Sequence, residues 1–252
     1  MGIQGLGLAT SITNFNLLTL TMVYCNCSSQ IRPALGRMSL ASLRGWSEYL
    51  SIALPSTIII CSEWWAFEVL TVISGIISIE AQAIQTIVTS GCAILFEVPL
   101  GYQEATCAVI GNCIGAGNVP LARRFMRLTT WVTLGTIFTL QLMIFFGKDA
   151  IAKFYSNDPK VQMLTSTVLI LVSFIFFFDG MQGFLQGPIR AIGLQKKASC
   201  WTFLCYYVIG IPVACYLALK KDMGVIGLQL GVGIAISLQC LSYVIILMRS
   251  DW

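Results

Sequence analysis

Seven long apolar runs divide the chain, and each approaches the length of about 20 residues that a bilayer-spanning helix needs. The runs are continuously apolar rather than alternating, which favours helices over a membrane barrel. The composition agrees, because 57% of the residues are hydrophobic and only 10% are charged, against roughly 25% charged in soluble domains. The sequence therefore predicts an all-α, polytopic membrane protein with about seven transmembrane helices. The predicted spans are approximately residues 3–25, 50–76, 82–110, 128–147, 162–188, 199–219 and 225–248.

The Lys and Arg residues between these runs fall mainly on one side of the predicted membrane. The segments on that side hold Arg32, Arg37, Arg44, Arg123, Arg124, Arg127, Arg190, Lys196, Lys197 and Arg249. The segments on the other side hold only Lys148, Lys153, Lys160, Lys220 and Lys221. Because cytoplasmic loops carry the excess of Lys and Arg, we expect the N-terminus outside and the C-terminus in the cytoplasm. The membrane would be the plasma membrane or that of a vacuole or vesicle.

Histidine is absent from the chain, and the ten cysteines follow no metal-binding spacing. A buried free cysteine behaves as a small hydrophobe, whereas zinc and histidine-based chemistry need residues that this sequence does not offer. We therefore expect no metal site, no cofactor and no enzymatic activity. Any proton chemistry must fall to carboxylates or tyrosines.

Two carboxylates, Glu63 and Glu68, lie inside the second apolar run. An ionised carboxylate in hydrocarbon is costly, so such a residue normally faces protein or a watery cavity and marks a substrate, ion or proton pathway. The two residues are five apart, which places them about 140° apart around a helix, so they cannot both point into one cavity. If one faces a central cavity, the other faces the interior of its own bundle. The pair is typical of a transporter.

Four sequence blocks occur in an order that resembles one known family. The first contains Glu63-Trp64-Trp65, and the second ends in a loop with Gly115-Ala116-Gly117-Asn118. The blocks resemble helix seven, helix eight with its following loop, the turn after helix ten, and helix eleven of eukaryotic MATE (multidrug and toxic compound extrusion) transporters. They span Trp46–Gly75, Val98–Arg123, Gln186–Lys196 and Tyr206–Leu228.

The resemblance implies a fold of twelve helices in two six-helix bundles with a substrate cavity between them. This chain is similar to helices six to twelve of that fold. Residues 1–45 would then be a single transmembrane helix, like helix six of the family, with a basic cytoplasmic loop. Residues 46–252 would form the six-helix C-terminal bundle. The chain would be a partial transporter that needs the N-terminal bundle or a homodimer partner within the lipid bilayer.

The resemblance also implies a secondary active antiporter that exports small organic cations or xenobiotics in exchange for protons. In the family, functional carboxylates occupy the positions of Glu63, Glu68 and Asp179, which we predict to couple proton and cation movement. We also predict a coupling role for Glu97 and Glu104, which lie seven apart on one helix face and flank Pro99. The family has apolar or small residues there, so these two could instead pair with a neighbouring polar group.

Aromatic and amide side chains would contact an organic cation, because Trp and Tyr rings attract cations by about 0.5–2 kcal/mol each. Family positions and proximity to Glu63 favour Trp64, Tyr206 and Tyr207, and the predicted amides are Gln82, Gln182 and Gln186. Thr202 stands where the family often has Asn. The interpretation places Glu80 in a short solvated loop after the second run.

Three other functions compete with proton-coupled export. Seven spans with an external N-terminus also fit a seven-helix receptor, although the sequence has neither Asp-Arg-Tyr nor Asn-Pro-x-x-Tyr and no lysine in its last run. A sodium-coupled exporter stays open, because carboxylates can hold either ion. A membrane-embedded enzyme has the least support.

Overall fold

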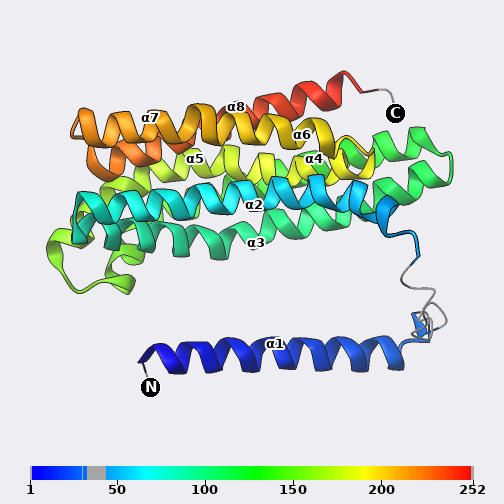
Figure 1. The fold of residues 1–252 in the computed structure, drawn as a ribbon, viewed down its shortest axis with the longest axis horizontal. Coiled ribbons are helices and arrows are strands. Elements are labelled where there is room, and N and C mark those ends of the chain that lie inside the picture. The colour runs from blue at the N-terminus through cyan, green and yellow to red at the C-terminus, as the bar shows by residue number, and fades with distance from the viewer. Residues whose placement is uncertain (1, 30, 33–43, 251–252) are drawn as a thin grey trace. The chain divides into compact units, whose positions relative to one another are not determined.

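The computed structural model describes residues 2–29, 31–32 and 44–250, and every regular element in those ranges is a helix. This confirms the predicted all-α fold (Figure 1). The chain from α6 to η4 is one continuous span, in which η3 and η4 are π-helical. The elements are α1 (Gly2–Cys27), α2 (Trp46–Ile77), α3 (Ile79–Gly115), α4 (Val119–Tyr155), α5 (Pro159–Ala191), α6 (Gln195–Phe203), η3 (Leu204–Gly210), α7 (Ile211–Cys215), η4 (Tyr216–Lys220) and α8 (Gly224–Met248).

Among the described residues, six helices are long and apolar enough to cross a membrane: α2, α3, α4, α5, the span from α6 to η4, and α8. α1 has 26 residues but is not one of them, and Asn14 and Asn16 interrupt its apolar sequence. The structure divides into two compact units, Met1–Tyr49 and Leu50–Trp252. Residues 33–43 of the predicted basic loop lie outside the described residues. The roles of residues 1–45 and 46–252 as separate domains stay predictions.

Polar residues at the starts of helices fix the turns of the second unit. The side chains of Ser78, Asn118 and Asp158 accept hydrogen bonds from backbone N–H groups two or three residues further on, at 3.0, 3.2 and 2.8 Å. Such N-caps each contribute about 1 kcal/mol. Because the connections are short, successive helices run antiparallel (Figure 1), and α3 contacts α4 as α4 contacts α5.

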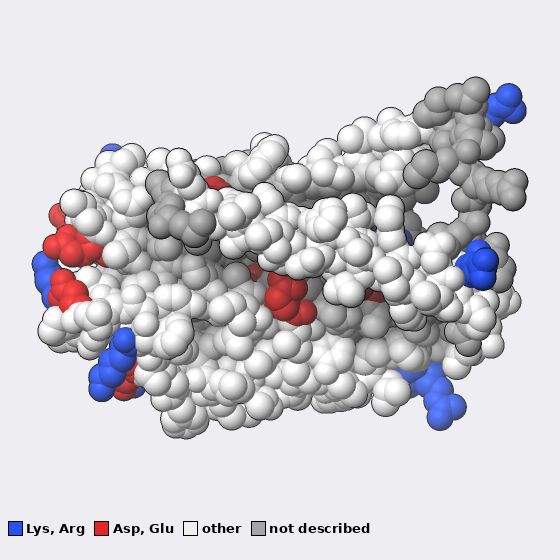
Figure 2. Space-filling view, turned by 90° about the horizontal axis from the view of Figure 1, so that it is seen from below, with Lys and Arg blue, Asp and Glu red and all other residues white. Residues whose placement is uncertain are grey.

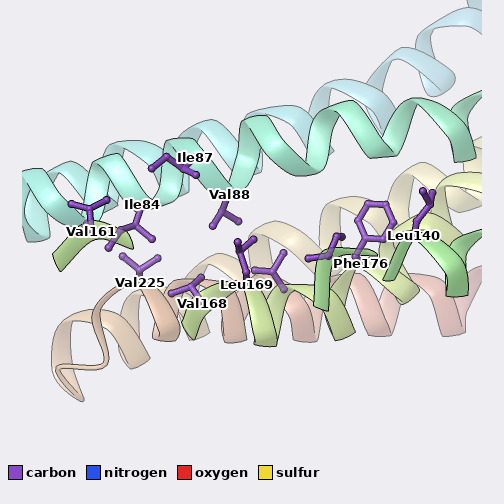
Figure 3. Close-up of a cluster of buried hydrophobic side chains, with 12 residues drawn as sticks. Ile84, Ile87, Val88, Leu140, Val161, Val168, Leu169, Phe176 and Val225 are labelled. Carbon is purple, nitrogen blue, oxygen red and sulfur yellow. The ribbon is translucent and has the colours of Figure 1, made fainter. Parts of the chain in front are cut away.

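A cluster of buried apolar side chains joins four helices of this unit (Figure 3). Side chains of α3 face those of α5, and α4 and α8 contribute at its edges. In lipid such packing works through van der Waals contact rather than through removal of water. The cluster fixes α3 against α5, and thereby the polar residues that these helices carry. Its labelled members are Ile84, Ile87, Val88, Leu140, Val161, Val168, Leu169, Phe176 and Val225.

α8 packs backbone to backbone against the span from α6 to η4. A Cβ added to Gly231 would lie 2.5 Å from Cβ of Ala214, and one added to Gly227 would lie 2.7 Å from the backbone N of Ala218. Small residues four apart on both helices allow this close approach. We call these four residues the glycine seam.

The basic side chains lie mainly toward the ends of the helices, as expected for helices that cross a membrane. On the face shown in Figure 2, Lys and Arg lie toward the two ends, and a few acidic side chains interrupt an otherwise uncharged middle. The long α4 carries Arg123, Arg124 and Arg127 near its start and Lys148 and Lys153 near its end. The uncharged stretch between them suits a hydrocarbon environment.

Candidate carboxylate site

Helices α2, α3, α5 and α8 line a partly open cavity of about 80 Å³. Most of its wall is apolar. The polar side chains that reach it are Glu63, Thr89, Asp179, Gln182 and Gln229. A cavity of this size has room for water beside its carboxylates.

Glu63 projects from the middle of α2 into the bundle and is only 8% exposed. Nε2 of Gln186 donates to its Oε1 and Oε2 at 2.9 and 3.1 Å, and Nε2 of Gln239 donates to Oε1 at 2.6 Å. These donors are amide NH2 groups, which cannot accept. They favour an ionised carboxylate, whereas burial penalises the charge. The hydrogen bonds and the burial therefore act in opposite directions on the ionisation of Glu63.

A line of amides on α5 links Glu63 to the second carboxylate of the cavity. Nε2 of Gln186 lies 3.0 Å from Oε1 of Gln182, and Nε2 of Gln182 donates to Oδ1 of Asp179 at 3.2 Å. Asp179, Gln182 and Gln186 follow one another at intervals of three and four residues, so they share one helix face. The half-buried Asp179 is thus joined to Glu63 by hydrogen bonds.

A second line runs from Glu63 toward α6. Nε2 of Gln239 also lies 2.8 Å from the hydroxyl of Tyr243 and 3.1 Å from Oγ1 of Thr202. The two hydroxyl oxygens are 2.7 Å apart, and Oγ1 of Thr202 donates to the carbonyl of Ala198 at 3.0 Å. All of these groups are buried.

The sequence prediction missed Gln239 and Tyr243 as members of the site. Their signal was present, because an amide and a phenol four residues apart on one face of an apolar helix need polar partners. Gln229 on the same helix is a similar case, since its Nε2 donates to Oε1 of Gln85 at 2.8 Å.

The structure brings Glu63, Asp179, Gln182 and Gln186 together. Four other predicted residues, Glu68, Glu97, Glu104 and Gln82, have exposed side chains and are not among the cavity-lining residues. Glu63 is buried and Glu68 exposed, in keeping with the angle of about 140° between them.

Arg190 and Lys160 hold two acidic side chains at the helix ends. Nη2 of Arg190 lies 2.5 Å from Oε1 of Glu104, and the two residues form an ion pair. Glu80 lies in the first turn of α3 rather than in a loop, because that helix starts at Ile79, and its Oε1 is 3.2 Å from Nζ of Lys160.

The predicted aromatic residues occupy different surroundings. Trp64 lines the cavity and is 49% exposed. Tyr206 is buried, and its hydroxyl has no hydrogen-bond partner among the described residues. The hydroxyl of Tyr207 donates to the carbonyl of Ser62 at 3.2 Å, and its ring stacks on Phe203 with 5.0 Å between centroids.

The sequence model of the MatE family matches residues 55–216. The chain belongs to the MatE family. Over its whole length this MatE chain is 27% identical to multidrug and toxin extrusion protein 1 of Oryctolagus cuniculus and 28% identical to multidrug and toxin extrusion protein 2 of Mus musculus. It is 30% identical over 93% of its length to an uncharacterized transporter of Schizosaccharomyces pombe. The chain spans 44%, 44% and 43% of these relatives, a little under half of each.

The fold agrees with that of a solved MatE relative. A crystal structure of the eukaryotic MATE transporter AtDTX14 covers 97% of the chain with a TM-score of 0.92 at 24% identity, and the chain covers 55% of it. Family and helices together make this MatE chain an integral, multi-pass membrane protein. They leave the receptor hypothesis without support.

Proposed function

We propose that this MatE chain is part of an exporter that moves small organic cations out of the cytoplasm in exchange for protons. The observation that carries the proposal is the buried Glu63, which amide donors hold beside a cavity in the middle of the bundle. Relatives named as multidrug and toxin extrusion proteins support it.

Competition at the carboxylates would couple the two movements. Ionised Glu63 and Asp179 can each take up a proton or stabilise a nearby cation, but a neutral carboxyl group loses most of its attraction for the cation. The rings of Trp64, Phe67 and Phe176 line the same cavity, and aromatic faces attract organic cations. Proton entry from one side would therefore favour release of the cation.

Sodium is the second candidate for the coupling ion, because carboxylate oxygens bind hard cations as well as protons. The hydrogen bonds argue against sodium at Glu63, since its oxygens already accept from two amides and are not free to form a cage around a metal ion.

Uptake measurements in proteoliposomes test the proposal and separate the two ions. The chain is reconstituted, and entry of a fluorescent organic cation is followed under an imposed pH gradient or, in matched vesicles, under a sodium gradient. Uptake driven by the pH gradient alone is the expected result. Uptake driven only by sodium would replace the proton in the mechanism. Absence of both, from protein that is shown to be inserted and folded, would contradict transport by this chain.

We further propose that the chain acts with a second bundle, either the N-terminal half that its relatives carry or a second copy. Its spans expose Glu68 and Glu97 on their outer surfaces, where contact with lipid would be costly. The chain is therefore expected to transport in vesicles as a self-associated species, and to be unstable or inactive as an isolated monomer. A monodisperse monomer with full transport activity, seen by light scattering and the uptake assay, would rule this out.

The proposed orientation places the C-terminus in the cytoplasm and the N-terminus outside. It follows from the bias of Arg and Lys between alternate loops. A C-terminal epitope tag is expected to bind antibody only after cells are permeabilised, whereas an N-terminal tag on the same chain should be reached in intact cells. The reverse pattern would invert the topology.

A further inference from the structure

The polar surroundings of Glu63 suit only one of its two protonation states. The hydrogen bonds that reach its oxygens come from the amide NH2 groups of Gln186 and Gln239. A carboxylate can accept all of them. A protonated carboxyl group also carries a hydrogen that requires an acceptor, and an NH2 group cannot provide one.

The side-chain amide of Gln239 also carries a hydrogen-bond acceptor, its Oε1. Its Oε1 is buried and has no hydrogen-bond partner among the described residues, which in a native interior calls for an explanation. Because Oε1 and Nε2 belong to one planar amide, a half-turn of that amide would replace the donor facing Glu63 by the acceptor. The half-turn requires no movement of α8.

The other neighbours of this amide tolerate both orientations. The hydroxyls of Tyr243 and Thr202 lie 2.8 and 3.1 Å from Nε2 of Gln239, and a hydroxyl can either donate or accept. Thr202 has the carbonyl of Ala198 as an acceptor in either case. The hydroxyl pair can therefore reorganise with both hydroxyls satisfied, while Nε2 of Gln239 moves to the position that Oε1 now occupies.

We propose that Gln239 is a positioning residue for Glu63, whose amide offers its NH2 group to the ionised carboxylate and its carbonyl oxygen to the protonated form. The inference deepens the proposed function, on which it rests for the role of Glu63. It implies that α8, through Gln239, positions Glu63 in both its ionised and its protonated form.

Other titratable groups near Glu63 must be separated from it in any test. They are Asp179 on α5, Cys92 on α3, and the tyrosines 206 and 243 on η3 and α8. Unperturbed thiols and phenols titrate well above neutral pH. Of these groups, Asp179 is therefore the one whose titration overlaps that of Glu63. Infrared difference spectra resolve the protonated carboxyl groups, and the band that Glu63→Gln removes belongs to Glu63.

The test is a pH titration of that band in the purified full chain in lipid. Gln239→Met removes the amide at nearly constant volume. The matched control is Gln229→Met, because Gln229 lies on the same helix, lines the cavity, is also buried and pairs with the amide of Gln85 rather than with a carboxylate. Gln239→Leu serves if Gln239→Met does not yield folded protein.

In Gln239→Met we expect the midpoint of the Glu63 band to move to higher pH by about one unit, because the hydrogen bond lost from the charged form is stronger than the one lost from the protonated form. Gln229→Met should leave it in place. An unchanged midpoint in the Gln239 variants, or equal movement in the control, would overturn the inference. Because the titration needs neither gradient nor substrate, failed uptake with a displaced midpoint would count against the proposed function alone. Normal uptake with an unchanged midpoint would count against the inference alone.

Discussion

Gradient-driven uptake of an organic cation is expected to fall about 5- to 150-fold when Glu63 is replaced by glutamine, the range of a typical coupling free energy between two binding sites. Glutamine has nearly the same shape and can still accept a hydrogen bond from Gln186 or Gln239. It cannot bind a proton or carry a charge, however, so competition between proton and cation ends. Initial rates of fluorescent-cation uptake under a fixed pH gradient measure the effect.

Glu80→Gln is the matched control for this experiment. Glu80 forms its ion pair with Lys160 at the start of α3, away from the cavity-lining residues, and its replacement should leave uptake within about twofold, because an exposed ion pair contributes at most about 1 kcal/mol. Full uptake by Glu63→Gln would place the coupling elsewhere, with Asp179 or the exposed Glu68 as the next residues to replace.

Alanine at position 231 is expected to destabilise the folded chain by about 1–3 kcal/mol, the usual cost of overpacking a filled interior. The new Cβ would overlap the backbone of Ala214 as well as its side chain, and a backbone cannot move aside as the end of a side chain can. α8 and the opposite span must therefore separate. Thermal unfolding in detergent, followed by the loss of folded protein on size-exclusion chromatography, provides the measurement.

Gly135→Ala is the control with the opposite expected sign. Gly135 lies in the exposed interior of α4 with nothing within 4 Å of an added Cβ, and alanine in such a helix is favoured by roughly 0.5–1 kcal/mol. The unfolding temperature should rise slightly. Equal behaviour of the two variants would mean that the glycine seam does not limit the packing of α8.

The spans were predictable because apolar length is a local property of the sequence. The helices nevertheless extend beyond the apolar runs. The run at 128–147 corresponds to α4, which covers Val119–Tyr155, since its charged first turns continue the helix past the hydrocarbon. Among the described residues, α1 is the predicted span that is absent from the six apolar enough to cross a membrane, and Asn14 and Asn16 lower its apolar character.

The candidate site was predictable only in part. A carboxylate within an apolar run is conspicuous in the sequence, so Glu63 and Asp179 could be predicted as site residues. Which amide meets which carboxylate depends on how distant helices pack, and Gln239 lies 176 residues from Glu63. The angular spacing separated Glu63 from Glu68, but it could not say which of the two faces the bundle interior.

The glycine seam has a consequence for movement. Side chains that interdigitate can change rotamer and let two helices shift gradually, whereas two backbones in direct contact have no such freedom. We therefore expect α8 and the span from α6 to η4 to travel as one rigid body in any transport cycle. Hinges should then lie outside that pair, and Gln239 and Thr202, which sit one on each helix, should keep their mutual distance while Glu63, carried by α2, approaches or leaves them.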